Sequence, residues 1–166
     1  MNDRFVVTED LYAGKGQRIA NLIIDRIIFM GLFYGFIFLL VILYEEGSYM
    51  ALWLENLSWI EDYLLTGILF GVLYFLSELL LKGRTIAKFI TRTVVVDEQG
   101  KTPDALAILG RSFSRMIPFD AFSYLGATGR GWHDSLSKTY VVDVQEFERK
   151  KRLFGEFNQI GNSTEE

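Results

Sequence analysis

Two long apolar runs dominate the pattern of hydrophobic and polar positions along the chain. The first run, Ile27 to Tyr44, contains no charge in 18 positions, and the second, Tyr63 to Lys82, is interrupted only by Glu78. Eighteen helical residues extend about 27 Å, close to the ~30 Å hydrocarbon core of a bilayer. A core helix of a soluble protein is seldom apolar on all sides over such a length. The pattern therefore predicts two transmembrane helices, over about residues 18–44 and 63–82.

The segments on either side of the second run differ in charge. Residues 45–62 carry five acids and neither Lys nor Arg, whereas residues 82–92 carry four bases. Positively charged loops stay on the cytoplasmic side of a membrane, so both termini are expected in the cytoplasm. The first 17 residues lack the apolar core of a signal peptide, and the first helix is expected to act as the uncleaved targeting element.

Shorter elements follow the two runs. Thr93–Val96 and Lys138–Val144 are rich in β-branched residues and are expected to pair as a small two-stranded β ribbon. Residues 105–127 are apolar but contain Arg111, Arg115, Asp120 and Pro118. This interruption favours an amphipathic helix at the cytoplasmic interface, although a third membrane-inserted segment stays open as an alternative. The predicted fold class is a mainly α membrane protein with two transmembrane helices, a cytoplasmic interfacial amphipathic helix and a small β ribbon.

Ionisable residues near the cytoplasmic ends of the two helices are the main candidates for a functional site. Arg18 and Asp25 share a helix face, but they lie about 10 Å apart along the axis and Arg18 leans away from Asp25. We therefore predict that Arg18 pairs with Asp134 or another cytoplasmic acid. Asp25 is predicted to pair with Arg111 or Arg115. The predicted charged network comprises Arg18, Asp25, Glu78, Arg111, Arg115 and Asp134.

This network admits two interpretations. It could be a structural set of ion pairs that docks the interfacial helix beneath the spans, because the arginines can compensate both acids. It could instead bind a cation or a proton, because carboxylates at membrane depth recur in such pathways. The structural interpretation is favoured. Asp134 is likewise expected to receive an arginine or to cap the backbone of the following turn, and not to relay protons with His133.

Each long helix contains a GxxxG motif, formed by Gly31 with Gly35 and by Gly67 with Gly71. Counted from the outer ends of the helices, Gly35 and Gly71 lie at nearly equal depth. Small residues at matched depth allow close packing, so packing of the two helices within one chain is the favoured interpretation. Dimerisation between chains and chance occurrence stay open as alternatives.

Several function classes have no support in the sequence. The chain has no Cys and a single His, His133, so we expect no metal site and no cofactor. The Gly-rich stretch at residues 126–131 lacks the pattern of a phosphate loop. The basic run Arg149–Arg152 lies among acids, so we expect it to contact anionic lipids and expect no nucleic acid partner. No catalytic arrangement is apparent, and the protein is not expected to be an enzyme.

Several of these motifs together resemble the RDD family of small prokaryotic membrane proteins. The family is named for an Arg and an Asp of its first helix and for a later Asp, which correspond here to Arg18, Asp25 and Asp134. Gly83–Pro103, GRTIAKFITRTVVVDEQGKTP, is similar to the family's GxTxGK…VV…G stretch, with Ala87 in place of the usual Gly. The resemblance covers about residues 16–144. It divides the chain into an N-terminal cytoplasmic segment (1–15), an RDD-like membrane domain (16–144) and a charged cytoplasmic tail (145–166).

The resemblance implies a multi-pass protein of the prokaryotic inner membrane whose family has no firmly assigned function. Some members are described as cation/proton antiporters, and others accompany membrane proteins and MoxR-type ATPases. We expect a non-enzymatic protein that contributes to cation or small-solute transport. The alternative is a scaffold or assembly subunit of a larger membrane complex. Two spans cannot enclose a solute pathway alone, so the expected partners are the lipid bilayer and either further copies of the chain or other membrane subunits.

Overall fold

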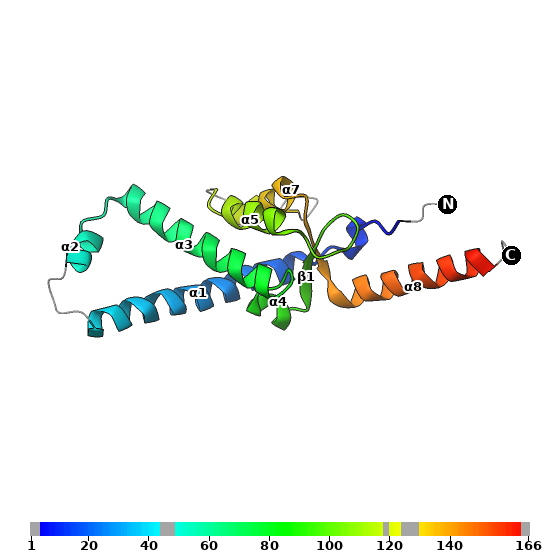
Figure 1. The fold of residues 1–166 in the computed structure, drawn as a ribbon, viewed down its shortest axis with the longest axis horizontal. Helices are drawn as coiled ribbons and strands as arrows, with labels where there is room; N and C mark the ends of the chain where they lie inside the picture. The colour runs from blue at the N-terminus through cyan, green and yellow to red at the C-terminus, as the bar shows by residue number, and fades with distance from the viewer. Residues whose placement is uncertain (1–3, 44–48, 118–119, 124–129, 164–166) are drawn as a thin grey trace.

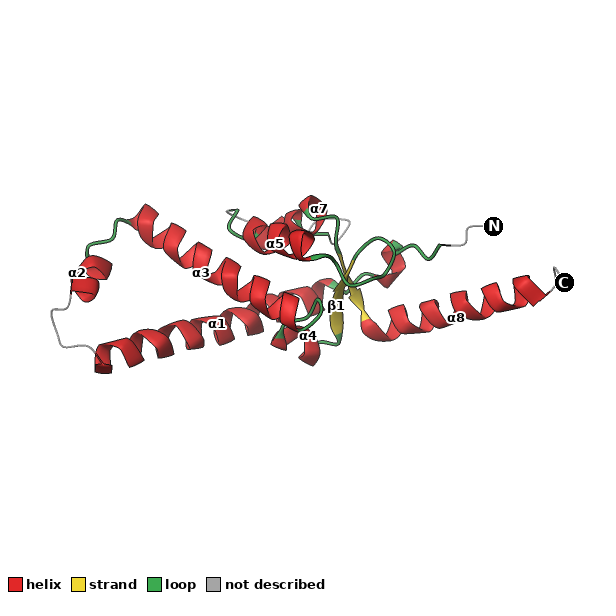
Figure 2. Ribbon diagram, in the orientation of Figure 1, coloured by secondary structure: helices red, strands yellow, loops and turns green. Residues whose placement is uncertain are grey.

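Two long helices and a compact junction between them form the framework of the protein (Figure 1, Figure 2). The structure, a computed structural model, describes residues 4–43, 49–117, 120–123 and 130–163. Helices α1 (Lys15–Leu43) and α3 (Trp59–Leu80) diverge from the junction, and the short helix α2 (Tyr49–Glu55) lies near their far ends. The chain's N-terminal segment and α8 (Val144–Ser163) lie at the opposite end of the molecule.

The exposed surfaces of α1 and α3 are those of membrane helices. Lys15–Leu40 and Trp59–Leu80 are long and apolar enough to cross a bilayer, yet only 11% and 22% of their apolar windows are buried. A soluble protein would cover such helices, because large contiguous apolar patches are rarely left in water. Here even bulky side chains such as Phe36 and Phe38 are more than half exposed. The two predicted membrane helices are therefore confirmed.

The predicted β ribbon is also confirmed. Strand β1 (Thr93–Val96) pairs antiparallel with β2 (Tyr140–Asp143), with Val94 opposite Val142. The ribbon packs against the N-terminal segment and the first turn of α8 through a small apolar core, formed by Val7, Leu11, Val96, Val142 and Phe147. The short helices η1 (Glu9–Leu11) and α4 (Ile86–Ile90) complete this part of the fold.

Helix α5 (Ala105–Ser114) forms as predicted and lies along α3. Gly71 faces the ring of Phe113, and Gly67 faces the side chain of Met116. Gly67 lies about 20 Å along α3 from the end of the helix at Leu80, so the contact extends well along the helix. The ten residues of α5 extend only about 15 Å and cannot cross a bilayer. Helices α6 (Asp120–Ser123) and α7 (Trp132–Leu136) follow, with α7 packed against α5.

The two GxxxG motifs do not meet within the chain, which contradicts the favoured prediction. An added Cβ at Gly31 or Gly35 would touch nothing within 4 Å among the described residues. The motif of α3, in contrast, receives α5. The physical reason is that α1 and α3 diverge from the junction, so the small residues of α3 face the third segment that packs beside them. Dimerisation through Gly31 and Gly35 stays a prediction.

Candidate functional site, a buried polar junction

Nine buried or largely buried ionisable side chains meet where α1, α3, α4, α5, α6 and α7 converge, and we call this cluster the polar junction. It contains every member of the predicted network and three further residues, Lys88, Asp120 and His133. Its members are Arg18, Asp25, Glu78, Lys88, Arg111, Arg115, Asp120, His133 and Asp134. Buried charges are costly unless they are paired and hydrogen-bonded. The partners of each carboxylate therefore decide what the junction can do.

One polar face of α1 supplies the first wall of the junction. Gln17 Nε2 donates to Asp143 Oδ2 at 2.8 Å, and Asn21 Nδ2 donates to Thr93 Oγ1 at 3.0 Å. These two bonds reach both strands of the ribbon. The helical spacing that places Arg18, Asn21 and Asp25 on one face thus fixes α1 against the ribbon and α4.

Asp134 joins two arginines that are far apart in the sequence. Its Oδ2 accepts from Arg18 Nη1 at 2.5 Å, as predicted, and from the backbone N–H of Gly131 at 3.2 Å. Its Oδ1 accepts a short hydrogen bond from Arg111 Nη1, and Asp134 is fully buried. Burial alone would raise the pKa of Asp134, but the nearby charges of His133, Arg111 and Arg18 hold it well below its ordinary value. Asp134 is therefore an ionised anchor for the two guanidinium groups at neutral pH.

Glu78 is the second anchor and connects α3 to α4 and α5. It is fully buried and accepts from Arg111 Nε at 2.9 Å and, in a short bond, from Lys88 Nζ. Arg115 Nη2 lies 3.7 Å from the same carboxylate, and its guanidinium lies over the ring of Tyr74 at 4.3 Å. Arg111 consequently bridges Glu78 and Asp134, so that one side chain holds α3, α5 and α7 together.

Asp25 does not pair with Arg111 or Arg115, which corrects the prediction. Its Oδ2 accepts from Thr85 Oγ1 at 2.8 Å and its Oδ1 from the backbone N–H of Ala87 at 3.3 Å. Both donors are neutral and belong to the first turn of α4, whose N-cap is Thr85. The reason is that the arginines are already bound by Glu78 and Asp134. Asp25 is 2% exposed and makes no ion pair with a described residue.

His133 and Asp120 form a smaller pair at the edge of the junction. His133 Nδ1 lies 2.6 Å from Asp120 Oδ2, and its backbone N–H donates to Asp120 Oδ1 at 3.0 Å. Its Nε2 lies 3.3 Å from Asp134 Oδ1. Burial, together with the charge of Arg115, lowers the pKa of His133 despite both carboxylates. The His133–Asp120 pair thus ties α7 to α6.

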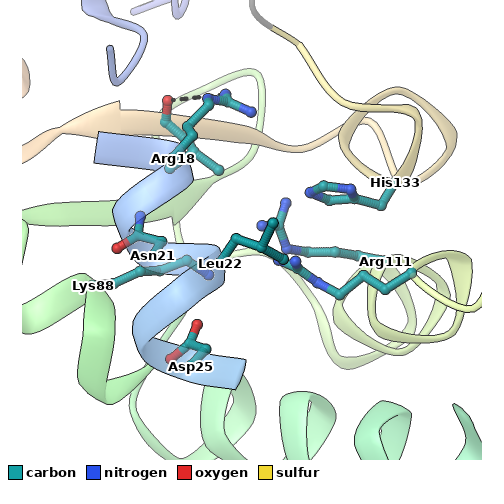
Figure 3. A pocket seen from close by; sticks show the side chains of 9 residues that line it. Arg18, Asn21, Leu22, Asp25, Lys88, Arg111 and His133 are labelled. Atoms are coloured by element: carbon teal, nitrogen blue, oxygen red, sulfur yellow. Dashed lines mark hydrogen bonds between the residues drawn. The ribbon is translucent and has the colours of Figure 1, made fainter. Parts of the chain in front are cut away.

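A small cavity of about 30 Å³ lies within the junction (Figure 3). Asn21, Leu22 and Asp25 line it from α1, and Arg111 and His133 extend toward them from α5 and α7. The cavity is polar and has room for a water molecule. Arg18 Nε, Arg111 Nη2 and Arg115 Nε have no acceptor among the described residues, and bound water would satisfy such donors. Asp25 therefore borders a space with polar lining residues that is large enough for a water molecule.

Lys88 lies on the other side of this cavity and was missed as a site residue. It is 2% exposed, and burial lowers its pKa to about 8, although Glu78 opposes this shift. Lys88 therefore carries its charge at neutral pH but releases a proton far more readily than an exposed lysine does. The spacing T-x-x-K could have revealed Lys88 as a site residue. Thr85 is a typical N-cap, so the sequence places Lys88 in the first turn of a short helix.

Comparison with known families agrees with the motifs of the junction. The sequence model of the RDD family matches residues 12–142, well over half of the 166-residue chain. The chain belongs to the RDD family. Comparison with curated proteins and with solved structures found no match to it. The matched range includes the whole polar junction of this RDD protein, from Arg18 to Asp134.

Within residues 4–43, 49–117, 120–123 and 130–163, no group of three or more His, Asp or Glu side chains is arranged to hold a metal ion. The buried acids are instead divided among bases and neutral donors. The junction thus holds ion pairs at Glu78 and Asp134 and leaves Asp25 without an ion pair among the described residues.

Proposed function

We propose that this RDD protein is a non-enzymatic subunit of the prokaryotic inner membrane that contributes to proton-linked transport of a cation or small solute. Asp25 would be the group that binds and releases the proton. The observation that carries this proposal is that Asp25 is buried, borders a water-sized cavity and accepts only from neutral donors. Ionisable groups at membrane depth without a fixed counter-charge are typical of proton pathways.

The charge around the cavity favours a proton over a metal cation at this position. Among the described residues, four cationic side chains line the cavity and Asp25 is the only carboxylate that does so. A metal cation would need several ligand atoms in a space lined by Arg18, Lys88, Arg111 and Arg115, whereas a proton needs only one oxygen of Asp25. The solute would then bind elsewhere, and its movement would be coupled to the charge of Asp25.

The solute pathway would require more than one chain. The described parts of α1 and α3 diverge and expose most of their apolar side chains, so they enclose no polar pore. We propose that further copies of the chain, or other membrane subunits, complete the wall of the solute pathway. The cytoplasmic placement of both termini is supported by Lys82, Arg84 and Arg92, which lie at the end of the spans that is closer to both termini.

Reconstituted protein tests the proposal directly. Purified chain in proteoliposomes with an internal pH dye is exposed to gradients of Na⁺, K⁺ or Li⁺, and wild type is expected to move protons in response to one of them. Asp25→Asn keeps the hydrogen-bond acceptor for Thr85 and should abolish the response. Glu55→Gln, an exposed acid of α2, is the matched control and should retain it. Absence of proton flux from folded wild-type protein under all gradients would contradict the proposal.

A second candidate function is assembly of a larger membrane complex, favoured by α8. This helix extends away from the junction, and Leu153 and Phe157 are 44% and 69% exposed on it. Such apolar positions on a projecting helix are typical of helix-mediated contacts. A stoichiometric partner that is retained in mild detergent by wild type and lost in Leu153→Ser/Phe157→Ser would support it. Identical retention by the variant would oppose it.

A further inference from the structure

A second polar feature, outside the junction, is a groove at the end of α3. It has a volume of about 370 Å³ and lies between the turn after α3, strand β1 and the first turns of α8. Four basic side chains line it, and Glu148 is the only acid that does so. We call it the basic groove; its bases are Lys82, Arg84, Lys101 and Lys151.

The described lining residues of the basic groove include four bases and one acid, in contrast to the balanced charges of the polar junction. None of its four bases forms a salt bridge with a carboxylate of the described residues. Arg84 lies over the ring of Phe89 at 5.1 Å, and Lys151 lies 5.4 Å from the ring centre of Phe147. These stacking contacts orient the side chains but leave their net charge available. The groove therefore attracts an anion.

The backbone that carries two of these bases is fixed. Gly83, between Lys82 and Arg84, has φ +82°, and its N–H donates to the carbonyl of Glu78 at 2.6 Å. An added Cβ at Gly83 would lie 2.6 Å from the carbonyl oxygen of Val95. The turn thus packs directly on β1, and only glycine fits there. The two bases leave this turn at defined positions at the end of the span.

Apolar side chains continue from the groove toward the membrane. Leu80 and Leu81, at the end of α3, are 74% and 37% exposed, and Phe89 and Ile90 on α4 are 50% and 63% exposed. The basic side chains therefore lie beside exposed apolar side chains at the end of a membrane helix. This arrangement is complementary to a phospholipid, which has a charged headgroup and apolar acyl chains. A soluble anion would use the bases but leave these apolar side chains uncovered.

We propose that the basic groove is a binding site for the phosphate-bearing headgroup of an anionic phospholipid, whose acyl chains lie against the end of α3 and against α4. The guanidinium of Arg84 is suited to a bidentate contact with phosphate oxygens, and the three lysines contribute charge around it. The site is separate from Asp25 and does not depend on transport. Through β1 and the turn at Gly83, a bound lipid holds the end of α3 against the ribbon.

Lipid titration of the full chain in detergent tests the site. Dioctanoyl phosphatidylglycerol is expected to raise the midpoint of thermal unfolding at concentrations at which dioctanoyl phosphatidylcholine does not. The variant Arg84→Gln/Lys151→Gln removes two charges of the groove and is expected to weaken the apparent affinity for phosphatidylglycerol by about tenfold or more. Native mass spectrometry of the same samples should show one retained phosphatidylglycerol in wild type.

A variant that removes the same number of charges elsewhere distinguishes binding in the groove from non-specific electrostatic attraction of the lipid. Arg4→Gln/Lys138→Gln also removes two exposed bases, but neither residue lines the groove or belongs to the basic run Arg149–Arg152, and this variant should bind like wild type. An equal loss in both variants would overturn the proposal in favour of non-specific attraction. Stabilisation by inorganic phosphate equal to that by phosphatidylglycerol would overturn the lipid as the ligand. If Arg84→Gln/Lys151→Gln unfolds, the single variant Lys101→Gln, on a surface turn, serves the same comparison.

Discussion

The two ends of the membrane helices are built in opposite ways. Toward α2, the side chains of α1 and α3 are apolar and exposed, and Gly31 and Gly35 face open space. At the other end, the polar junction holds Glu78, Arg111 and Asp134 with no exposed surface. In the outer part of α3 a hydrogen bond from Tyr63 Oη to the carbonyl of Met116 is made, whereas the junction contains several buried ion pairs. In this RDD protein, the exposed apolar side chains suit α1 and α3 to a membrane, and the buried ion pairs hold the helices together at the junction.

The largest effect is expected from breaking the junction at its most connected carboxylate. Asp134→Ala leaves Arg18 and Arg111 buried without their shared counter-charge and should lower the free energy of unfolding by about 3–5 kcal/mol. Chemical unfolding in detergent, followed by circular dichroism, measures this. The control Glu146→Gln removes an exposed pair with Arg149 and should change little. A small effect at Asp134 would mean that burial, and not pairing, dominates the junction.

A backbone substitution tests the junction end of the molecule without changing charge. Gly83→Ala forces a Cβ against the carbonyl of Val95 at positive φ and should cost about 1–3 kcal/mol of stability. Gly16→Ala is the matched control because nothing lies within 4 Å of its added Cβ among the described residues. The thermal midpoints of the two variants give the comparison. Similar midpoints would show that the turn after α3 can relax.

Acid should unfold the junction before it affects the membrane helices. The native pKa of Asp134 lies well below the unfolded value of 3.8, so below about pH 4 the unfolded state binds more protons. Stability is therefore fully present above that pH and falls as the pH approaches the native pKa, by up to about 1.4 kcal/mol per pH unit for one proton. Near-ultraviolet circular dichroism should change first. Asp134→Asn should flatten this dependence, and an unchanged slope would contradict the assignment.

The smallest effect is expected in the outer part of α1. Gly31→Ala/Gly35→Ala meets open space in the chain and should leave the free energy of unfolding within about 0.5 kcal/mol of wild type or slightly raised. Cross-linking in the membrane, measured on the same variant, reports whether these glycines instead face a second copy. A large loss of monomer stability would show that the outer halves of α1 and α3 pack more closely than they do here.

The sequence predicted those features that depend on local pattern. Hydrophobic runs identified α1 and α3, β-branched residues identified both strands, and the axial distance between Arg18 and Asp25 predicted that they pair apart. The partner of Asp25 was missed for two reasons. The arginines pair with Glu78 and Asp134, which the sequence does not reveal, and the actual donor, Thr85, is the N-cap of a helix of only five residues. The glycine packing was wrong because motif and depth carry no information on the angle between two helices.

The residues of the polar junction are far apart in the sequence, so they are synthesised at different times and cannot pair at once. Arg18 and Asp134 are 116 residues apart, so the arginine leaves the ribosome long before its carboxylate. At about 5–20 residues per second the interval is roughly 6–23 s. Throughout it, the first helix carries charged groups at the membrane without their final counterparts. Until Asp134 is made, Arg18 therefore lacks the carboxylate with which it pairs in the folded chain.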